Sequence, residues 1–160
     1  MTVSIVNIHA SCVVLEGAGQ GLGAPYDAGV LILGESGAGK SDLALRLIAM
    51  GARLVADDRC DLSVTSGSLC AAVPLALAGM IEIRGVGIVR VPYQPKARIA
   101  LAVRLSHPAA VRRLPESTSY CPPSPLELPE PRRPREIMLA PFEASAPAKI
   151  LAAAAEFARR

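Results

Sequence analysis

The strongest constraint on this chain is an eight-residue segment that fits the pattern GxxxxGK[ST] at every fixed position. Apolar residues 30–33 precede it as a predicted strand, and residues 42–50 follow it as a predicted helix that ends near Gly51. Glycines let the backbone turn tightly with N–H groups pointing inward, and the helix dipole adds positive charge there. The pattern therefore predicts a phosphate-binding loop formed by Gly34, Glu35, Ser36, Gly37, Ala38, Gly39, Lys40 and Ser41.

Two side chains of this loop have the chemistry to act on a nucleotide. Lys40 can reach the β- and γ-phosphates, and the Ser41 hydroxyl can ligate Mg²⁺. The sequence contains neither an NKxD motif, typical of GTPases, nor the LSGGQ motif of a transporter class. The loop thus indicates a nucleotide-binding α/β protein and leaves the reaction open.

Two adjacent carboxylates follow the next predicted strand, residues 53–56. With the loop and its helix, this strand completes the order of a βαβ unit. Adjacent side chains at a strand end point in different directions. One of Asp57 and Asp58 can therefore face Mg²⁺ while the other accepts a proton from an attacking hydroxyl. The alternative is a solvated turn, since Asp is common after strands.

A second unusual block covers residues 79–89. Glu82 and Arg84 lie two residues apart and would share one face of a strand, while Gly85 and Gly87 permit close backbone approach. A carboxylate and a guanidinium on one face suit a metal–phosphate site. The alternative is an ordinary strand with an exposed, ion-paired edge.

The rest of the pattern fits a single α/β domain over residues 1–160. A glycine-rich stretch, residues 17–25, has no helix pattern after it and is predicted as a flexible loop. Residues 108–134 are rich in proline and are predicted to be mostly irregular. Further strands, an apolar block and a terminal helix are expected at residues 3–8, 12–15, 62–64, 69–73, 80–91 and 149–159.

Composition narrows the classes of protein that fit. Hydrophobic residues make up 51% and aromatic residues 3%, so we expect a core of Val, Leu, Ile and Ala. The net charge of +3, without interleaved aromatics, does not favour nucleic-acid binding, and the late arginines suit phosphate instead. The four cysteines form no CxxC pair and predict no zinc site. The absence of a signal peptide or a long apolar span favours a cytoplasmic protein that does not bind membranes.

Together these segments resemble the catalytic domain of HPr kinase/phosphorylase, the bifunctional bacterial regulator of the phosphotransferase system. The resemblance covers nearly the whole chain from His9 onward. It depends on His9, on the blocks GESGAGKSDLALRLI, GARLVADDR and GMIEIRGVGIV, and more weakly on PRRPR at residues 131–135. The third block is the most specific, because P-loop proteins in general lack it.

By position, the resemblance implies a role for each site residue. Lys40 is catalytic within the nucleotide-binding loop, and His9 also belongs to the site. Asp58 accepts a proton in phosphorylation and donates it in the reverse direction. Ser41 and Glu82 are the implied magnesium ligands.

The family transfers phosphate from ATP or pyrophosphate to a serine of HPr and removes it by phosphorolysis. The resemblance thus implies a Mg²⁺-dependent serine kinase, a fold like the nucleotide domain of phosphoenolpyruvate carboxykinase, and a homo-oligomer, typically a hexamer. A P-loop kinase of a small metabolite stays open as an alternative. A module that senses ATP without transferring it is the other alternative, although the set of catalytic-type residues argues against it.

Later segments resemble the family less closely. Arg113 is the best candidate for a catalytic arginine, with Arg112 as its rival, and residues 131–136 would serve dephosphorylation. The chain is similar to a short form without the N-terminal domain of longer members, and residues 16–28 are extra. The loop PRRPRE replaces the family's PVRPGR, and the added Glu136 is expected to weaken phosphorolysis.

Overall fold

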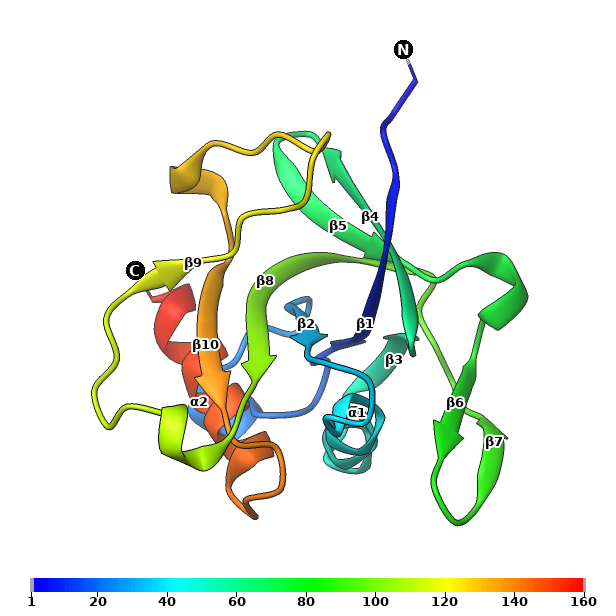
Figure 1. The fold of residues 1–160 in the computed structure, drawn as a ribbon, viewed down its shortest axis with the longest axis vertical. Coiled ribbons are helices and arrows are strands. Elements are labelled where there is room, and N and C mark those ends of the chain that lie inside the picture. The colour runs from blue at the N-terminus through cyan, green and yellow to red at the C-terminus, as the bar shows by residue number, and fades with distance from the viewer. Residues whose placement is uncertain (1, 160) are drawn as a thin grey trace.

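The computed structural model describes residues 2–159, which contain an eight-stranded sheet, a two-stranded hairpin and two α-helices (Figure 1). The sheet consists of β1 (Val6–Val14), β2 (Gly29–Leu33), β3 (Arg53–Ala56), β4 (Arg59–Thr65), β5 (Ser68–Ala72), β8 (Lys96–Leu105), β9 (Thr118–Ser119) and β10 (Arg135–Leu139). The other elements are the hairpin strands β6 (Met80–Ile83) and β7 (Gly87–Arg90), the helices α1 (Lys40–Ala49) and α2 (Ala146–Ala158), and short 3-10 turns at Gln20–Leu22, Leu75–Leu77, Pro108–Ala110 and Glu130–Arg132.

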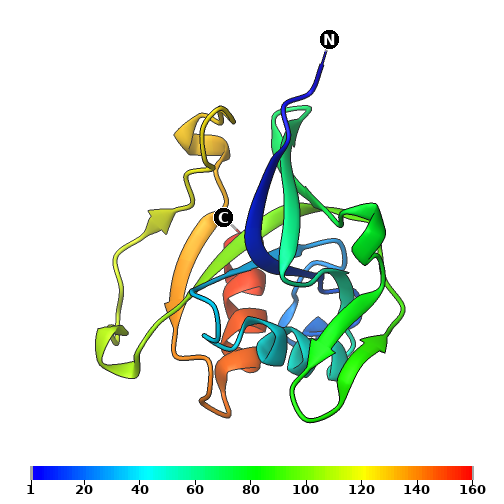
Figure 2. The same cartoon turned by 45° about the vertical axis from the view of Figure 1, so that its right-hand side comes forward.

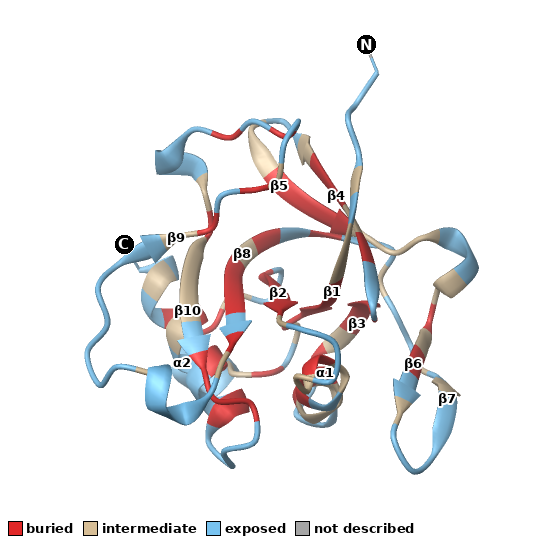
Figure 3. Ribbon diagram, in the orientation of Figure 1, coloured by how far each residue is buried: buried red, intermediate tan, exposed pale blue. Residues whose placement is uncertain are grey.

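Strand pairing closes the centre of the sheet into a ring. β1 pairs with β2 and β4, β4 with β5, β5 with β8, and β8 returns to pair with β2. One apolar cluster fills the inside, where Cys12, Leu31 and Leu62 meet. A second cluster lies on the outer face, which both helices cover (Figures 2 and 3). Successive side chains of β2 point to opposite faces of the sheet, so Leu31 belongs to the first cluster and Ile32 to the second.

The ring determines where ligands can bind. β2, β8 and β10 are parallel, and β1 runs antiparallel between β2 and β3. The carboxyl ends of β2, β3, β8 and β10 therefore meet at one edge. Open parallel sheets bind ligands at that edge.

Several predicted elements are confirmed, and others are corrected. The strand–loop–helix–strand order at residues 29–56 is present, but β1 separates β2 from β3. The strands expected at residues 3–8 and 12–15 are one strand that continues through His9, because residues 9–11 keep pairing with β4 and β2 and form no loop. The loop at residues 17–25 is packed, with Ala18 and Ala24 buried in the outer cluster.

The block at residues 79–89 is a hairpin and not a single strand. Gly85 in the turn between β6 and β7 and Gly87 at the start of β7 have φ values of 88° and 114°, which only glycine adopts readily. Glu82 lies in β6, but Arg84 lies in the turn, so the two side chains do not share a strand face. Strands β8 and β10 are absent from the predicted elements.

The cysteines within residues 2–159 are free thiols. Cys12, Cys60 and Cys70 are buried free thiols, and Cys121 is an exposed one. A side-chain hydrogen bond with Cys60 and, to a smaller extent, burial raise the pKa of Cys12. Neither helix within residues 2–159 is both long and apolar enough to cross a bilayer.

The centre of β8 should dominate the stability of the domain. Leu101 is fully buried in the outer cluster. We expect Leu101→Ala to lower the free energy of unfolding by about 2–5 kcal/mol, the range for buried leucines. Urea unfolding followed by circular dichroism measures this value. The exposed Leu75→Ala is the matched control and should stay within about 0.5 kcal/mol of wild type.

Candidate active site

The phosphate-binding loop connects β2 directly to α1, as the sequence pattern predicts. Gly37 and Gly39 have φ values of 80° and 100°, so glycine is needed at both positions. A Cβ atom at Gly39 would also lie 2.9 Å from the ring of Phe142. The helix begins at Lys40, so its free N–H groups and positive dipole end face the loop.

The side chain of Lys40 folds back onto the phosphate loop. Lys40 is only 6% exposed, and Nζ donates hydrogen bonds to the carbonyls of Gly34 at 2.7 Å and Glu35 at 2.8 Å. Burial lowers the pKa of Lys40, while Asp58 and Asp57 oppose that change. The ammonium therefore lies at the centre of the loop, where it can exchange carbonyl partners for phosphate oxygens.

Asp57 connects the phosphate loop to β1 and β6 through hydrogen bonds. Its Oδ1 accepts hydrogen bonds from the Ser41 hydroxyl at 2.6 Å and the Ser11 hydroxyl at 3.0 Å. Its Oδ2 accepts one from the backbone N–H of Glu82 at 3.1 Å. Asp57 is buried, so these bonds satisfy a carboxylate that water does not reach freely. The sequence left open which aspartate faces Ser41, and the structure assigns Asp57.

Asp58 points the other way and reaches His9. Its Oδ1 lies 2.5 Å from Nε2 of His9, and its side chain is 65% exposed. The residue has a φ of 68°, a left-handed conformation that Asp tolerates better than most residues. The turned backbone lets two consecutive carboxylates serve different neighbours. Asp58 is thus fixed in direction and open to an incoming substrate.

These groups surround one cavity of about 380 Å³. Arg84 at the hairpin turn and Phe142 extend its wall. Of the residues predicted for the site, those lining this cavity are His9, Ser36, Gly37, Gly39, Lys40, Ser41, Asp58 and Glu82. Folding thus brings together side chains from β1, the loop, the end of β3 and the hairpin.

Other predicted residues lie elsewhere. Arg112 and Arg113 are exposed beyond the 3-10 turn Pro108–Ala110 and line neither of the two cavities described here. Residues 131–136 lie at the amino end of β10, opposite to the edge that carries the loop. Glu136 nonetheless pairs with Arg104 at 2.9 Å, and Arg104 lines the second cavity. The catalytic arginine and the dephosphorylation loop stay predictions.

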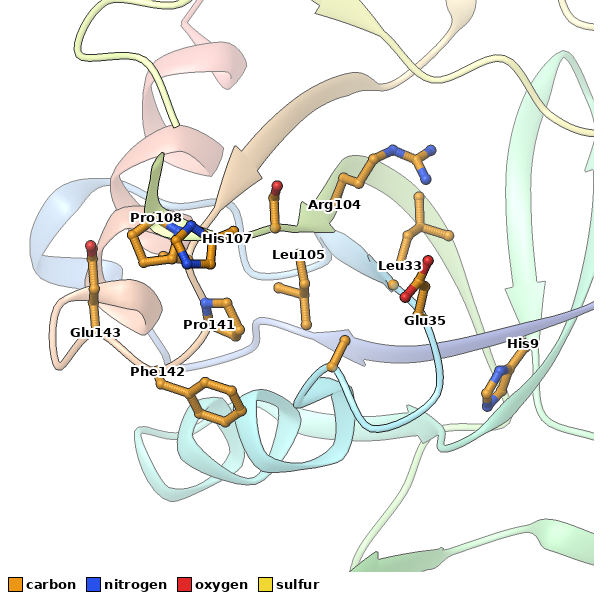
Figure 4. Close-up of a pocket in the computed structure, with 14 residues that line it drawn as sticks. His9, Leu33, Glu35, Arg104, Leu105, His107, Pro108, Pro141, Phe142 and Glu143 are labelled. Carbon is orange, nitrogen blue, oxygen red and sulfur yellow. The ribbon is translucent and has the colours of Figure 1, made fainter. Parts of the chain in front are cut away.

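A second cavity of about 1000 Å³ adjoins the first and shares His9 and Phe142 with it (Figure 4). Gly34, Glu35 and Ala38 of the phosphate loop form one wall. The ends of β2 and β8 and the segments after β8 and β10 form the others. Their lining residues are Leu33, Arg104, Leu105, Ser106, His107, Pro108, Ala140, Pro141, Phe142 and Glu143. Sequence reasoning missed this cavity, because it did not predict the two strands that precede those segments.

Oxygen donors that suit Mg²⁺ lie beside the phosphate loop. Within residues 2–159 no three His, Cys, Asp or Glu side chains gather as a metal cluster. Mg²⁺ bound to a nucleotide typically takes one or two carboxylates with phosphate and water oxygens, so a full protein cage is not needed. The Ser41 hydroxyl, its partner Asp57 and the nearby Glu82 supply hard oxygen donors beside the loop. The residues present fit magnesium.

A phosphate loop after a strand, a helix starting at its lysine, and a carboxylate on its serine define an α/β protein of the P-loop class. The family model of the HPr serine kinase C-terminal domain matches residues 21–114, more than half of the chain. The chain therefore belongs to this family. His9 precedes the matched segment.

Individual relatives agree with this assignment. The HPr kinase/phosphorylase of Clostridium tetani is 52% identical over 67 residues, which is 42% of this chain and 22% of the relative. That of Clostridium novyi is 51% identical over the same lengths. The chain thus spans about a fifth of the curated relatives it matches. The HPr(Ser) kinase/phosphatase structure from Coxiella burnetii is 25% identical, with a TM-score of 0.70 over 96% of this chain and 94% of that one.

Proposed function

We propose that this domain transfers the γ-phosphoryl group of ATP, with Mg²⁺, to a serine of an HPr-type phosphocarrier protein. The observation that carries the proposal is the shared cavity of Lys40 and Asp58, a phosphate-binding cation beside an exposed carboxylate. The family relatives, named as HPr kinases, supply the acceptor class. Phosphorolysis, a cytoplasmic location and a homo-oligomer, hexameric by resemblance, belong to the same proposal.

Binding of the donor needs little rearrangement of this chain. The loop N–H groups and the start of α1 hold the phosphates, and Lys40 moves its hydrogen bonds from two carbonyls to phosphate oxygens. Bound Mg²⁺ would neutralise charge on the β- and γ-phosphates, with Ser41 and Glu82 as its protein ligands and Asp57 holding Ser41. Phosphoryl transfer needs mainly such positioning and charge neutralisation.

Asp58 accepts the proton of the attacking serine hydroxyl. Its carboxylate faces the cavity, while His9 contacts one oxygen and leaves the other for the substrate. In the reverse direction Asp58 returns the proton to the serine oxygen as the phosphoryl group leaves. The same residue serves both directions because only its protonation state changes.

A single assay tests the proposal. The protein is incubated with purified HPr, Mg²⁺ and either ATP or pyrophosphate, and the mass of HPr is measured. Addition of one phosphate to an HPr serine from ATP supports the proposal, and addition from pyrophosphate as well supports the phosphorylase. A small-metabolite panel in parallel identifies the alternative kinase. No transfer to HPr in the presence of bound nucleotide would rule out the proposed acceptor.

The proposed magnesium ligand gives a separate prediction. Glu82 is exposed, so Glu82→Gln should leave the fold intact and remove a carboxylate from the cavity. We expect the Mg²⁺ concentration for half-maximal transfer to rise by about 10- to 100-fold. This is the range by which metal affinity falls when residues that support a metal site are replaced. Titration of Mg²⁺ in the transfer assay measures this shift. Glu127→Gln, also exposed and outside both cavities, is the control and should not move it.

A further inference from the structure

The proposed function leaves the nucleoside end of the donor without a binding site. The γ-phosphate belongs in the smaller cavity, because Lys40, Asp58 and Glu82 line it. The remainder of the nucleotide must leave the phosphate loop elsewhere. The larger cavity opens on the same loop at Gly34, Glu35 and Ala38.

The larger cavity lies at the carboxyl ends of parallel strands. β2, β8 and β10 all point their carboxyl ends at it, and it is built from the segments that follow them. Ligands of parallel sheets bind at this edge. Its volume, about 1000 Å³, is at the top of the range of ligand pockets, about 300–1,000 Å³. It has room for a base and ribose.

One aromatic ring marks where a flat base can bind. Phe142 is one of two Phe in a chain with 3% aromatic residues, yet it is 72% exposed. Its ring lies against the loop at Gly39 and lines both cavities. An aromatic face beside a phosphate-binding loop is a stacking platform for a base.

The platform is held in place by the neighbouring helices. The guanidinium of Arg46 in α1 donates hydrogen bonds to the carbonyls of Pro141 and Glu143, the latter at 3.2 Å. Lys149 in α2 pairs with the Glu143 carboxylate at 2.7 Å. The backbone on both sides of Phe142 is thereby fixed. The ring is positioned before any ligand arrives, which lowers the entropic cost of binding.

The rest of the lining is mostly apolar, with polar side chains that include Arg104, Ser106 and His107. Leu105 and Pro141 line the cavity, while Glu35 and His9 lie toward its other end (Figure 4). Nδ1 of His107 accepts a hydrogen bond from the N–H of Ala109 at 3.1 Å. In the neutral ring the proton is then on Nε2, which can donate to an acceptor on the base or ribose.

We infer that the larger cavity binds the base and ribose of the donor, with the base stacked on Phe142. The inference rests on the proposed function and adds the part of the site that distinguishes a nucleotide from a bare polyphosphate. ATP uses both cavities, whereas pyrophosphate uses the smaller one and the loop alone. The two ligands must therefore respond differently to changes at Phe142.

Calorimetric titration of wild type and Phe142→Ala with MgATP and with magnesium pyrophosphate tests this difference. Loss of one base–aromatic stack should weaken ATP binding by at least about fivefold, the lower end of the stacking range. Pyrophosphate affinity should change by less than about twofold, since it makes no stacking contact. Phe142→Tyr should restore ATP affinity, and Leu75→Ala, exposed and outside both cavities, should behave as wild type.

The chain contains no Trp, which permits a direct readout. Phe142→Trp introduces the sole indole, whose fluorescence ATP should quench by stacking and pyrophosphate should leave unchanged. An equal loss of affinity for both ligands in Phe142→Ala, or no loss of affinity for ATP, would overturn this inference and leave the proposed function in place. Failure of wild type to bind either ligand would overturn the proposed function and this inference together.

Discussion

Lys40→Ala should abolish phosphoryl transfer, with a loss of at least about a thousandfold in the rate of HPr phosphorylation. Lys40 is the cation inside the phosphate loop, and it is 6% exposed. Its removal leaves the developing phosphate charge without this cationic partner. Quantitative mass measurement of HPr over time gives the rate for each variant.

Two comparisons make this result specific. The loss of the ammonium also frees the carbonyls of Gly34 and Glu35, so circular dichroism must show that the variant folds. Lys96→Ala is the matched control, because Lys96 is exposed and outside both cavities. Transfer by Lys40→Ala within about tenfold of wild type would contradict the role of the loop lysine.

Asp58→Asn should remove most of the transfer activity while nucleotide binding persists. An amide keeps the size of the side chain but cannot accept the proton of the attacking serine. The expected loss is about 10²- to 10⁴-fold, the usual contribution of a general base. The rate of HPr phosphorylation and the calorimetric affinity for MgATP are measured on the same preparation.

The control for Asp58→Asn is Asp61→Asn. Asp61 lies in β4, three positions along the chain, and accepts a hydrogen bond from Asn7 at 2.7 Å outside the cavity. The Asp61→Asn variant should phosphorylate HPr at the wild-type rate. An Asp58→Asn protein that phosphorylates HPr at the wild-type rate would remove Asp58 from its proposed role, whereas loss of ATP binding would assign it to the donor site.

Part of the site could be predicted because its determinants are local in sequence. The strand, loop and helix at residues 29–49 follow from consecutive apolar residues, glycines and helix formers. The different directions of Asp57 and Asp58 follow from strand geometry. Which of them meets Ser41 did not follow, because that depends on the pairing of β1 with β3.

The larger cavity could not be predicted, because it depends on contacts far apart in the chain. β8 contains a continuous apolar run at residues 99–103, typical of a buried strand, which the predicted elements omit; its parallel pairing with β2 and β10 joins residues far apart in the sequence. Phe142 is one aromatic residue in an irregular segment, and only the fold brings it to Gly39. The hairpin was misread as a strand, because the glycines of its turn were interpreted as points of close backbone approach.

The short connection between β3 and β4 determines how firmly the acidic pair is held. Asp57 and Asp58 are the whole link between two strands that both pair with β1, so the acidic pair belongs to the framework of the ring. The hairpin beside it forms its own small sheet and presents Val86 and Ile88 to solvent. The acidic pair is thus held by the paired strands of the ring, whereas the exposed residues of the hairpin make no strand pairing with the ring and can change without moving the pair.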